Sequence, residues 1–358
     1  MPAWVKGAAA DMDTAIAAAA ELLGAARTPV IAGLNAEVSA IRAAYDLAGR
    51  VGASLDTLGA AGTYAELGSL SRSGAMTSTP AEVVGRADAV LVVGANPWGT
   101  DLTARILDSR PSRGRAAGAE RALLALGTGA PQAALTVPAE GGLLPGLALL
   151  RAHLRGHLAD PSPTAALAGK LAGSHYVAVL YDPAEIGEMG VETIQGLVVD
   201  LNDTTRAFSL AVAGPGGTQD RAVVPVAAWT TGQAPRVGLG RRVPEHDSWR
   251  FDAARQVAAG EADAALWLAS VPAPAPDWLN RIPSVALIGD ASPEAAEVVI
   301  AVGVPGRDLG GVLWNETRGA LTYWPPRAGG AAPADLPSAA SVLGRLTDRL
   351  AGRSDTAC

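Results

Sequence analysis

Hydrophobic positions along this chain follow two alternating periods. Residues 14–27 and 183–202 carry apolar side chains at helical spacing, whereas 29–33 and 87–94 are short, continuous apolar runs. Short apolar runs bounded by glycine, proline or polar residues predict buried strands, and the longer periodic stretches predict helices. Strands buried on both faces are typical of parallel sheets covered by helices. The pattern therefore predicts an α/β fold of Rossmann-like parallel sheets flanked by helices.

The same alternation continues along the rest of the chain. Further helices are predicted over residues 36–50, 80–85, 102–107, 143–158 and 338–350, and further strands over 53–55, 176–180, 207–213, 261–268, 285–288 and 298–302. Asp13, Asn35, Asp101 and Thr218 are suited to N-capping the helices that follow them. Residues 327–337, rich in Pro, Gly and Ala, predict a linker.

One segment of the chain is echoed later in the sequence. Residues 86–93 and 261–268 both read as a charged residue, then Ala-Asp-Ala, then four apolar positions. Such an echo indicates two related Rossmann-like halves. We therefore expect a discontinuous Rossmann-like domain of residues 1–57 and 174–330, an inserted α/β domain of 58–173, and a C-terminal segment of 331–358 that holds a linker, a helix and a tail.

The charge of the chain excludes several classes of protein. Lys and Arg total 28 against 35 Asp and Glu, a formal net charge of -7, and basic residues do not cluster. Nucleic-acid binding requires clustered basic residues, so nucleic acid is not an expected partner. A membrane span needs about 20 consecutive apolar residues, and no segment approaches this. The first residues also lack the pattern of a signal peptide, which predicts a cytoplasmic protein.

The hydrophobic content is high and has two interpretations. Hydrophobic residues make up 49% of the chain and charged residues 18%, and there are eight Trp against two Phe. Charged residues usually reach about 25% in soluble domains. The excess of apolar groups fits either an ordinary Ala-rich core or a surface buried against partner subunits. Composition alone leaves both interpretations open.

The four histidines give little support for a metal site. His153 and His157 are four residues apart on a predicted helix, a spacing that suits two metal ligands. Two arginines on the same face would repel a cation, so a solvated helix face is the favoured interpretation. His175 and His246 lack neighbouring ligands in the sequence, and we expect structural roles for both.

Three glycine-rich turns follow predicted strands. Residues 59–63, 94–97 and 214–218 fall where α/β sheets bind ligands, but they carry no acid, base or thiol. A tight turn is favoured over a phosphate site at 214–218. The nearest ionisable group, Asp101, suits a helix cap equally well. The single cysteine, Cys358, is the last residue and cannot supply a set of thiolate ligands.

Taken in order, these segments resemble the B subunit of formylmethanofuran dehydrogenases, a family within the molybdopterin oxidoreductase superfamily. The resemblance spans about residues 13–326. It rests on the segments 28–33, 86–89, 94–97, 197–202, 229–232 and 260–264. No single motif is specific, but their order along the chain is.

The departures from this family concern the residues that hold its cofactors. Ala60 and Ala61 stand before Gly62 where the family places its catalytic Cys and a neighbouring His. The family's Asp-Pro-Arg resembles 127–129 here, its Asp-Pro resembles Ser270 and the two residues after it, and the iron–sulfur segment is missing. The resemblance thus implies a truncated molybdopterin oxidoreductase core without the iron–sulfur domain, with no metal, no cofactor and no catalytic residue. Vestigial loops are expected at Gly62, Asn96, Gly129 and Gly216.

This combination of features is similar to the B subunit of bacterial formyltransferase/hydrolase complexes. The resemblance implies one-carbon metabolism of methylotrophs, in which such a complex converts formyl-tetrahydromethanopterin to formate through a methanofuran-type carrier. The implied partners are the amidohydrolase-like A subunit, which is the hydrolase, the C subunit, and the D subunit, which is the formyltransferase. The chain would be a non-catalytic scaffold. The alternative is an active oxidoreductase that binds a pterin or a nucleotide at the loops of Gly62, Asn96 and Gly216.

Two structural expectations follow from a lost cofactor. Short residues at positions 60–62 allow the vestigial loops to contact one another, and Trp98 is expected to be largely buried among them. The low charge and the many Trp residues also predict an apolar patch on the isolated chain that a partner normally covers.

Overall fold

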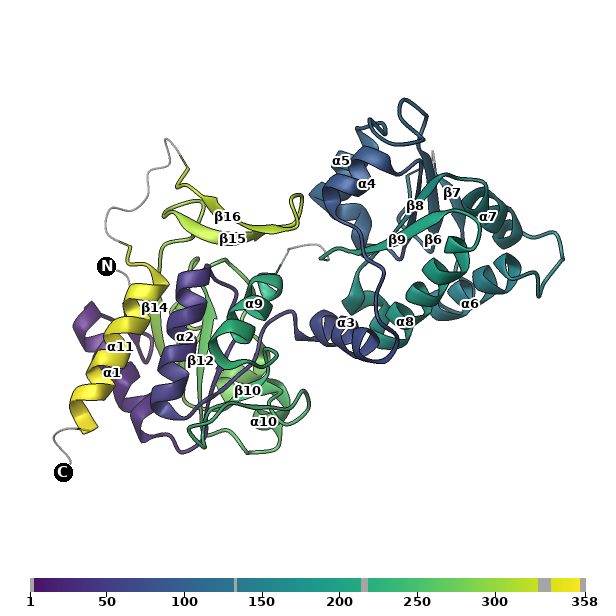
Figure 1. Ribbon diagram of the computed structural model, residues 1–358. Helices are drawn as coiled ribbons and strands as arrows, with labels where there is room; N and C mark the ends of the chain where they lie inside the picture. The colour runs from purple at the N-terminus through teal and green to yellow at the C-terminus, as the bar shows by residue number, and fades with distance from the viewer. Residues whose placement is uncertain (1–2, 132–133, 214–217, 328–335, 355–358) are drawn as a thin grey trace. The chain divides into compact units, whose positions relative to one another are not determined.

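The chain folds into two compact units. A computed structural model describes residues 3–131, 134–213, 218–327 and 336–354. The first unit comprises Met1–Ala60, Thr218–Trp314 and Leu321–Cys358, and the second comprises Ala61–Gly217 and Asn315–Ala320. Figure 1 shows that each unit is a sheet with helices packed on it. The predicted α/β class is therefore confirmed.

A mixed sheet forms the centre of the first unit. Among the described residues it has nine strands in the order β11-β10-β4-β3-β12-β13-β14-β1-β2. The bounds are β1 Ala3–Val5, β2 Ala8–Ala10, β3 Pro29–Ala32, β4 Ser54–Leu55, β10 Val237–Gly238, β11 Glu245–His246, β12 Ala264–Ala269, β13 Ser284–Ile288 and β14 Val298–Ala301. The five strands from β4 to β14 pair in parallel, whereas β10 and β1 pair antiparallel with them. The sheet is thus parallel only in its centre, which corrects the expectation of a wholly parallel sheet.

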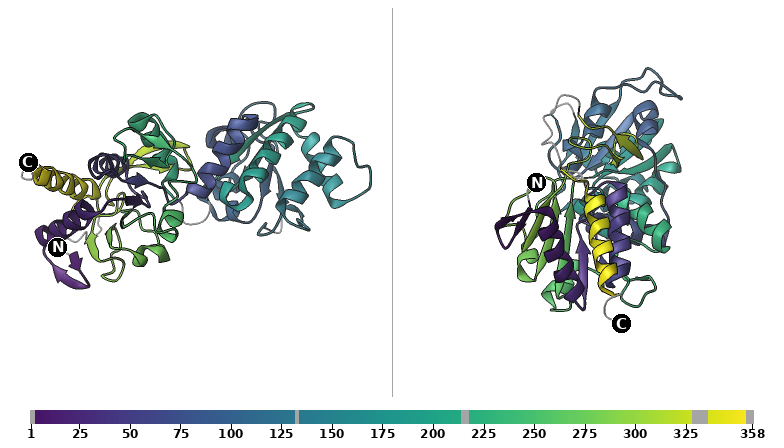
Figure 2. Two further views of the ribbon diagram at one scale, coloured as in Figure 1. Left: turned by 90° about the horizontal axis from the view of Figure 1, so that it is seen from below. Right: turned by 90° about the vertical axis from the view of Figure 1, so that its left-hand side faces the viewer.

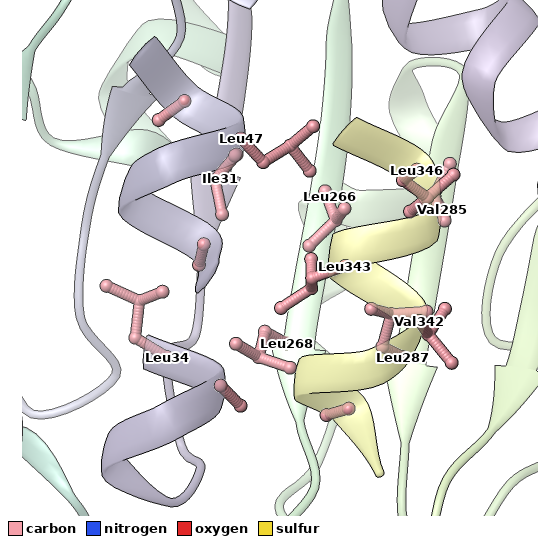
Figure 3. Close-up of a cluster of buried hydrophobic side chains, with 14 of the residues drawn as sticks. Ile31, Leu34, Leu47, Leu266, Leu268, Val285, Leu287, Val342, Leu343 and Leu346 are labelled. Atoms are coloured by element: carbon pink, nitrogen blue, oxygen red, sulfur yellow. The ribbon is translucent and has the colours of Figure 1, made fainter. Parts of the chain in front are cut away.

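Helices cover both faces of this sheet. They are α1 Met12–Ala25, α2 Val38–Val51, α9 Asp220–Thr231, α10 Ala253–Ala258, η2 Asp277–Arg281 and α11 Ala339–Ser354. The C-terminal helix α11 lies beside α1 and α2 (Figures 1 and 2). Its residues Leu343 and Leu346 pack with Leu266 and Val285 of the sheet (Figure 3). On the other face, Trp267 meets Trp278 edge to face, with ring centroids 6.2 Å apart. Both faces are therefore buried, which accounts for the continuous apolar runs.

The second unit contains a wholly parallel sheet. Among the described residues it has five strands in the order β7-β6-β5-β8-β9. The elements of this unit are α3 Ala60–Ser73, α4 Pro80–Arg86, β5 Ala89–Val93, η1 Asn96–Gly99, α5 Asp101–Leu107, β6 Ala122–Leu126, β7 Leu135–Val137, α6 Leu143–Leu154, α7 Pro163–Ala172, β8 Tyr176–Tyr181, α8 Pro183–Asn202 and β9 Arg206–Ala211. A separate hairpin consists of β15 Gly311–Asn315 and β16 Ala320–Trp324. All five strands of the parallel sheet end at the same edge, which is where α/β proteins bind ligands.

The observed division of the chain differs from the predicted one. The prediction joined residues 174–217 to the first domain, but β8 pairs in parallel with β5, with Val177 opposite Ala89. Residues up to Gly217 therefore belong to the second unit. The sequence echo correctly marks two equivalent strands, β5 and β12. It does not reveal which later strands pair with each of them.

Most predicted helices and strands are confirmed, with their ends displaced by a few residues. The N-caps are Asp11, Glu37, Thr100 and Gln219 in place of Asp13, Asn35, Asp101 and Thr218. Residues 60–62, predicted as a turn, form the first turn of α3. No helix within the described ranges is long and apolar enough to span a membrane. The cytoplasmic location stays a prediction.

The aspartate of the echoed segment has the same structural role in both units. Asp88 precedes β5 and accepts hydrogen bonds from the amides of His175 and Tyr176, at the start of β8. Asp263 precedes β12 and accepts from the amides of Arg27 and Thr28, just before β3. Each carboxylate thus ties together the beginnings of two neighbouring parallel strands. The role of the echoed Ala-Asp-Ala motif is therefore to connect neighbouring strands of each sheet, and these bonds account for its aspartate without a ligand.

We expect the substitution Asp88→Ala to destabilise the second unit by roughly 2–3 kcal/mol, because it leaves amides at the strand start without their charged acceptor. The side chain of Asp88 is only 11% exposed, whereas Asp263 is exposed and water can replace its carboxylate. Asp263→Ala should therefore cost less, about 1 kcal/mol. Chemical denaturation of the full chain measures both, with the exposed Asp160→Ala as control. Equal losses for all three variants would contradict the proposed role.

Candidate functional site

The predicted vestigial loops lie at the carboxyl end of the parallel sheet in the second unit. Asn96 follows β5 at the start of η1, and Gly129 follows β6. Gly62 lies in the first turn of α3, where an added Cβ would come within 3.4 Å of the amide nitrogen of Ala184, just after β8. Gly216 lies outside the described residues, as does Cys358. Three of the four predicted loop positions are thus placed at one edge of one sheet.

Two acidic side chains occupy the loop that follows β5. The amides of Ala95 and Asn96 donate to the two carboxylate oxygens of Glu185, at 2.7 Å to Oε1 and 3.0 Å to Oε2. The side-chain amide of Asn96 donates to Asp182 Oδ2 at 2.8 Å. Asp182 also accepts from the amide of Ala184 at 2.9 Å, which caps the first turn of α8. The loop's polar groups are therefore bonded to side chains of the chain itself.

Trp98 fills part of the space beside this loop. Its side chain packs against the cluster of Val90, Val92 and Leu102. An added Cβ at Gly129 would lie 3.2 Å from Trp98 Cδ1, so the loops after β5 and β6 are in close contact. Trp98 has intermediate exposure, and its Nε1 is buried and has no hydrogen-bond partner among the described residues.

Ala60 and Ala61, the positions expected to have lost catalytic residues, carry only methyl side chains. Ala60 is buried and Ala61 is exposed at the start of α3, and a methyl group can neither bind a metal nor transfer a proton. Among the described residues, His, Cys, Asp and Glu form no group of three that could hold a metal ion.

A second polar network closes the carboxyl end of the sheet in the first unit. Ser270, after β12, donates its hydroxyl to Glu37 Oε2 at 2.8 Å. Asn35, after β3, donates its side-chain amide to the carbonyl of Val271 at 3.0 Å and accepts from the amide of Gln219 at 2.8 Å. Asn35 therefore joins loops and does not cap α2. Burial raises the pKa of Glu37 above its usual value, although the hydrogen bond from Ser270 opposes the shift.

Sequence reasoning did not identify Asp56, another carboxylate at this edge. It follows β4 and accepts from Arg236 Nε at 2.9 Å and from the amide of Ala253 at 2.9 Å. Arg236 also pairs with Asp252, with 2.6 Å between Nη2 and Oδ2. Burial raises the pKa of Asp56, and the bonds from Arg236 oppose that shift. An acid directly after the predicted strand over residues 53–55 was the available signal for Asp56.

The histidines have separate local roles. His153 hydrogen-bonds Ser162, with 3.2 Å between Nε2 and Oγ. Helix α6 ends at Leu154, so His157 lies beyond the helix and the two histidines do not share a helical face. His175 contacts Asp88, and His246 contacts the carbonyl of Arg236. These contacts agree with the structural roles expected for them.

A hollow of about 780 Å³ lies at the opposite end of the second unit's sheet. It is lined by the beginnings of β8 and β9, including Tyr176 and Phe208, whose ring centroids are 5.4 Å apart. Arg86 and Arg206 also line it, and Arg86 pairs with Glu82. The sequence motifs gave no indication of this hollow.

The buried Glu37 predicts a pH-dependent contribution to stability. Its folded-state pKa is above the unfolded value, so its contribution is favourable when it is protonated and is lost as the pH rises through the folded-state pKa. Glu37→Gln keeps the acceptor for Ser270 without a buried charge. Relative to wild type, the variant should gain stability at alkaline pH, and the gain should shrink as the pH falls toward 4.5.

Denaturant unfolding at several pH values measures this difference. The exposed Glu294→Gln, in the same unit, is the control and should show a small difference that does not follow the same pH dependence. If the difference in unfolding free energy between Glu37→Gln and wild type stays constant from acid to alkaline pH, burial does not raise the pKa of Glu37.

Comparison with known proteins identifies one relative along almost the whole chain. No family model matches the chain. The B subunit of the formyltransferase/hydrolase complex Fhc of Methylorubrum extorquens is 56% identical over 357 residues, which cover 98% of each chain. One chain of the crystal structure of the formyltransferase/hydrolase complex (FhcABCD) from Methylorubrum extorquens in complex with methylofuran matches with a TM-score of 0.91 and 54% identity. The match covers 98% of this chain and 99% of that one.

The identity and the coverage are high enough to establish kinship over both units. They confirm the resemblance to this type of B subunit that the order of sequence motifs indicated. The chain belongs to the family of Fhc B subunits of formyltransferase/hydrolase complexes.

Proposed function

We propose that this chain is a non-catalytic structural component of a formyltransferase/hydrolase complex. Its partners would be the amidohydrolase-like hydrolase (the A subunit), the C subunit, and the formyltransferase (the D subunit). The complex would convert formyl-tetrahydromethanopterin to formate through a methanofuran-type carrier. The observation that carries this proposal is the 56% identity, over 98% of the chain, to an Fhc B subunit.

The geometry of the sheet edges supports a role without a cofactor. A pterin nucleotide would need free loop amides for its phosphates, but those of Ala95 and Asn96 are bonded to Glu185. A molybdenum or tungsten centre of this superfamily would need a soft ligand, and Ala60 stands at that position. The residues present therefore do not fit either group. This also favours the scaffold over the alternative of an active oxidoreductase.

The fold is consistent with descent from an enzyme. Two α/β units that each start a central strand with Ala-Asp-Ala suit a truncated molybdopterin oxidoreductase core that lacks the iron–sulfur domain. In such a lineage the sheets and helices are kept because they support the surfaces that meet other subunits. The loops would be free to change once they no longer held a cofactor.

Exposed aromatic and aliphatic side chains provide candidate contacts with partner subunits. In the first unit, Trp229 is 56% exposed and Trp249 is 69% exposed. In the second unit, Met189 and Val199 of α8 are 61% and 54% exposed. Large apolar side chains in water are typical of surfaces that a partner covers. We propose that these residues contribute to contacts between subunits.

A scaffold role predicts that the complex tolerates changes at the vestigial loop. The complex purified with Asn96→Ala or Asp101→Asn should keep its formyl transfer and hydrolysis rates within about twofold, a change of under 0.5 kcal/mol in barrier height. Mass spectrometry of the assembled complex and elemental analysis accompany the assay. A loss of rate of more than about tenfold in a fully assembled complex, or near-stoichiometric molybdenum, tungsten or iron in this chain, would overturn the proposal.

The proposal also predicts that the chain depends on its partners. Expressed alone, it should self-associate in size-exclusion chromatography and melt at a lower temperature than it does in the complex. Trp229→Asp should weaken co-purification with the partners if Trp229 is covered by one, and the adjacent exposed Thr230→Asp is its matched control. A monomeric chain with the same melting temperature alone and in the complex would contradict the predicted dependence.

A further inference from the structure

The loop after β5 binds an anion through consecutive backbone amides. The N–H groups of Ala95 and Asn96 converge on the carboxylate of Glu185, and each bonds a different oxygen at 2.7 and 3.0 Å. Successive amides that point at one anion form a concave site of the kind that binds phosphate. The site also lies at the carboxyl end of a parallel strand, where α/β proteins hold anionic ligands. Glu185 therefore takes the place of a ligand.

Gly94 is fitted to this carboxylate. Its backbone φ of 89° is in the region that favours glycine. A Cβ added there would overlap Glu185 Oε2, so any side chain at this position would force the carboxylate to move. Any larger residue at position 94 would expel the carboxylate from the loop. The glycine thus allows an oxygen to approach the backbone closely, and here that oxygen belongs to Glu185.

The start of α8 is shaped to deliver Glu185 to the loop. At Gly187 the backbone leaves the helical region, with φ 67° and ψ 176°, so the turn formed by residues 183–186 is separate from the rest of the helix. Asp182 caps this turn through the amide of Ala184 and binds the side chain of Asn96. Two acidic side chains from one turn therefore hold one loop.

We infer that residues 94–96 form an oxyanion-binding site and that Glu185 is its built-in ligand. Because the carboxylate is attached to the same chain, its effective concentration at the site is high and free anions do not compete with it. Removing the carboxylate exposes a site for a small oxyanion, of which inorganic phosphate is the simplest probe. This inference stands whether or not the chain is a scaffold.

The test compares Glu185→Ala with wild type in the full chain. Without phosphate, the variant should melt at a lower temperature, because two loop amides lose a charged acceptor. Added sodium phosphate should then raise its melting temperature saturably, by roughly 2–4 °C beyond the effect of sodium chloride at equal ionic strength. Wild type and the control Glu188→Ala, whose carboxylate pairs with Arg72 outside the loop, should respond to both salts alike.

Two results would overturn the inference. One is a Glu185→Ala protein that gains no more from phosphate than from chloride, and the other is a wild type that gains as much from phosphate as the variant does. If Glu185→Ala does not fold, the milder Glu185→Gln decides, because phosphate can displace a neutral side chain from the two amides. A melting temperature that phosphate raises more than chloride does supports the inference, and an equal response to both salts refutes it.

Discussion

The structure depends on how the chain satisfies the polar groups at the carboxyl ends of its parallel strands. Strands that end together leave loop amides and carbonyls at one edge, and such groups are costly to bury without partners. In an enzyme of this fold class a bound ligand can supply those partners. Here carboxylates of the chain serve as acceptors at these edges: Glu185 and Asp56 accept from backbone amides, whereas Asp182 and Glu37 accept from the side chains of Asn96 and Ser270. A sheet edge suited to an anionic ligand is thereby made stable without one.

The carboxylates differ in how their charge is balanced. Asp56 is compensated by Arg236, whereas Glu37 has a hydroxyl donor in Ser270 and its pKa is raised mainly by burial. Glu185 is held by two backbone amides, whose dipoles cannot be lost by substitution of a side chain. At the carboxyl edge of the second unit's sheet, the acceptor Glu185 is therefore held mostly by the backbone of one loop. That gives Gly94 and Asn96 a structural role in holding the carboxylate of Glu185.

Sequence reasoning predicted the parts of the fold that depend on local pattern. The apolar runs at β5 and β12 identified the central strands, because short, continuous apolar runs bounded by turn residues are typical of strands buried on both faces. It missed α3, since the small residues before Thr63 read equally well as a turn. It also divided the chain too early, because strand pairing such as that of β8 with β5 is a long-range choice. The bond between Asn96 and Asp182 spans 86 positions and could not be inferred from either segment alone.

The site also shows what a resemblance can and cannot supply. Resemblance to a family of enzymes predicted replaced residues at Ala60 and Ala61, but it did not predict that Glu185 bonds the loop after β5. The replacement required a turn capped by Asp182, a break at Gly187 and a glycine at 94, three features that are ordinary when taken one at a time. Their combined effect, which is to place Glu185 at the loop, is evident only once the fold brings them together. Under the proposed scaffold role, the chain keeps the sheets of this fold class, bonds one loop at the ligand edge with its own carboxylates, and retains surfaces for partner subunits.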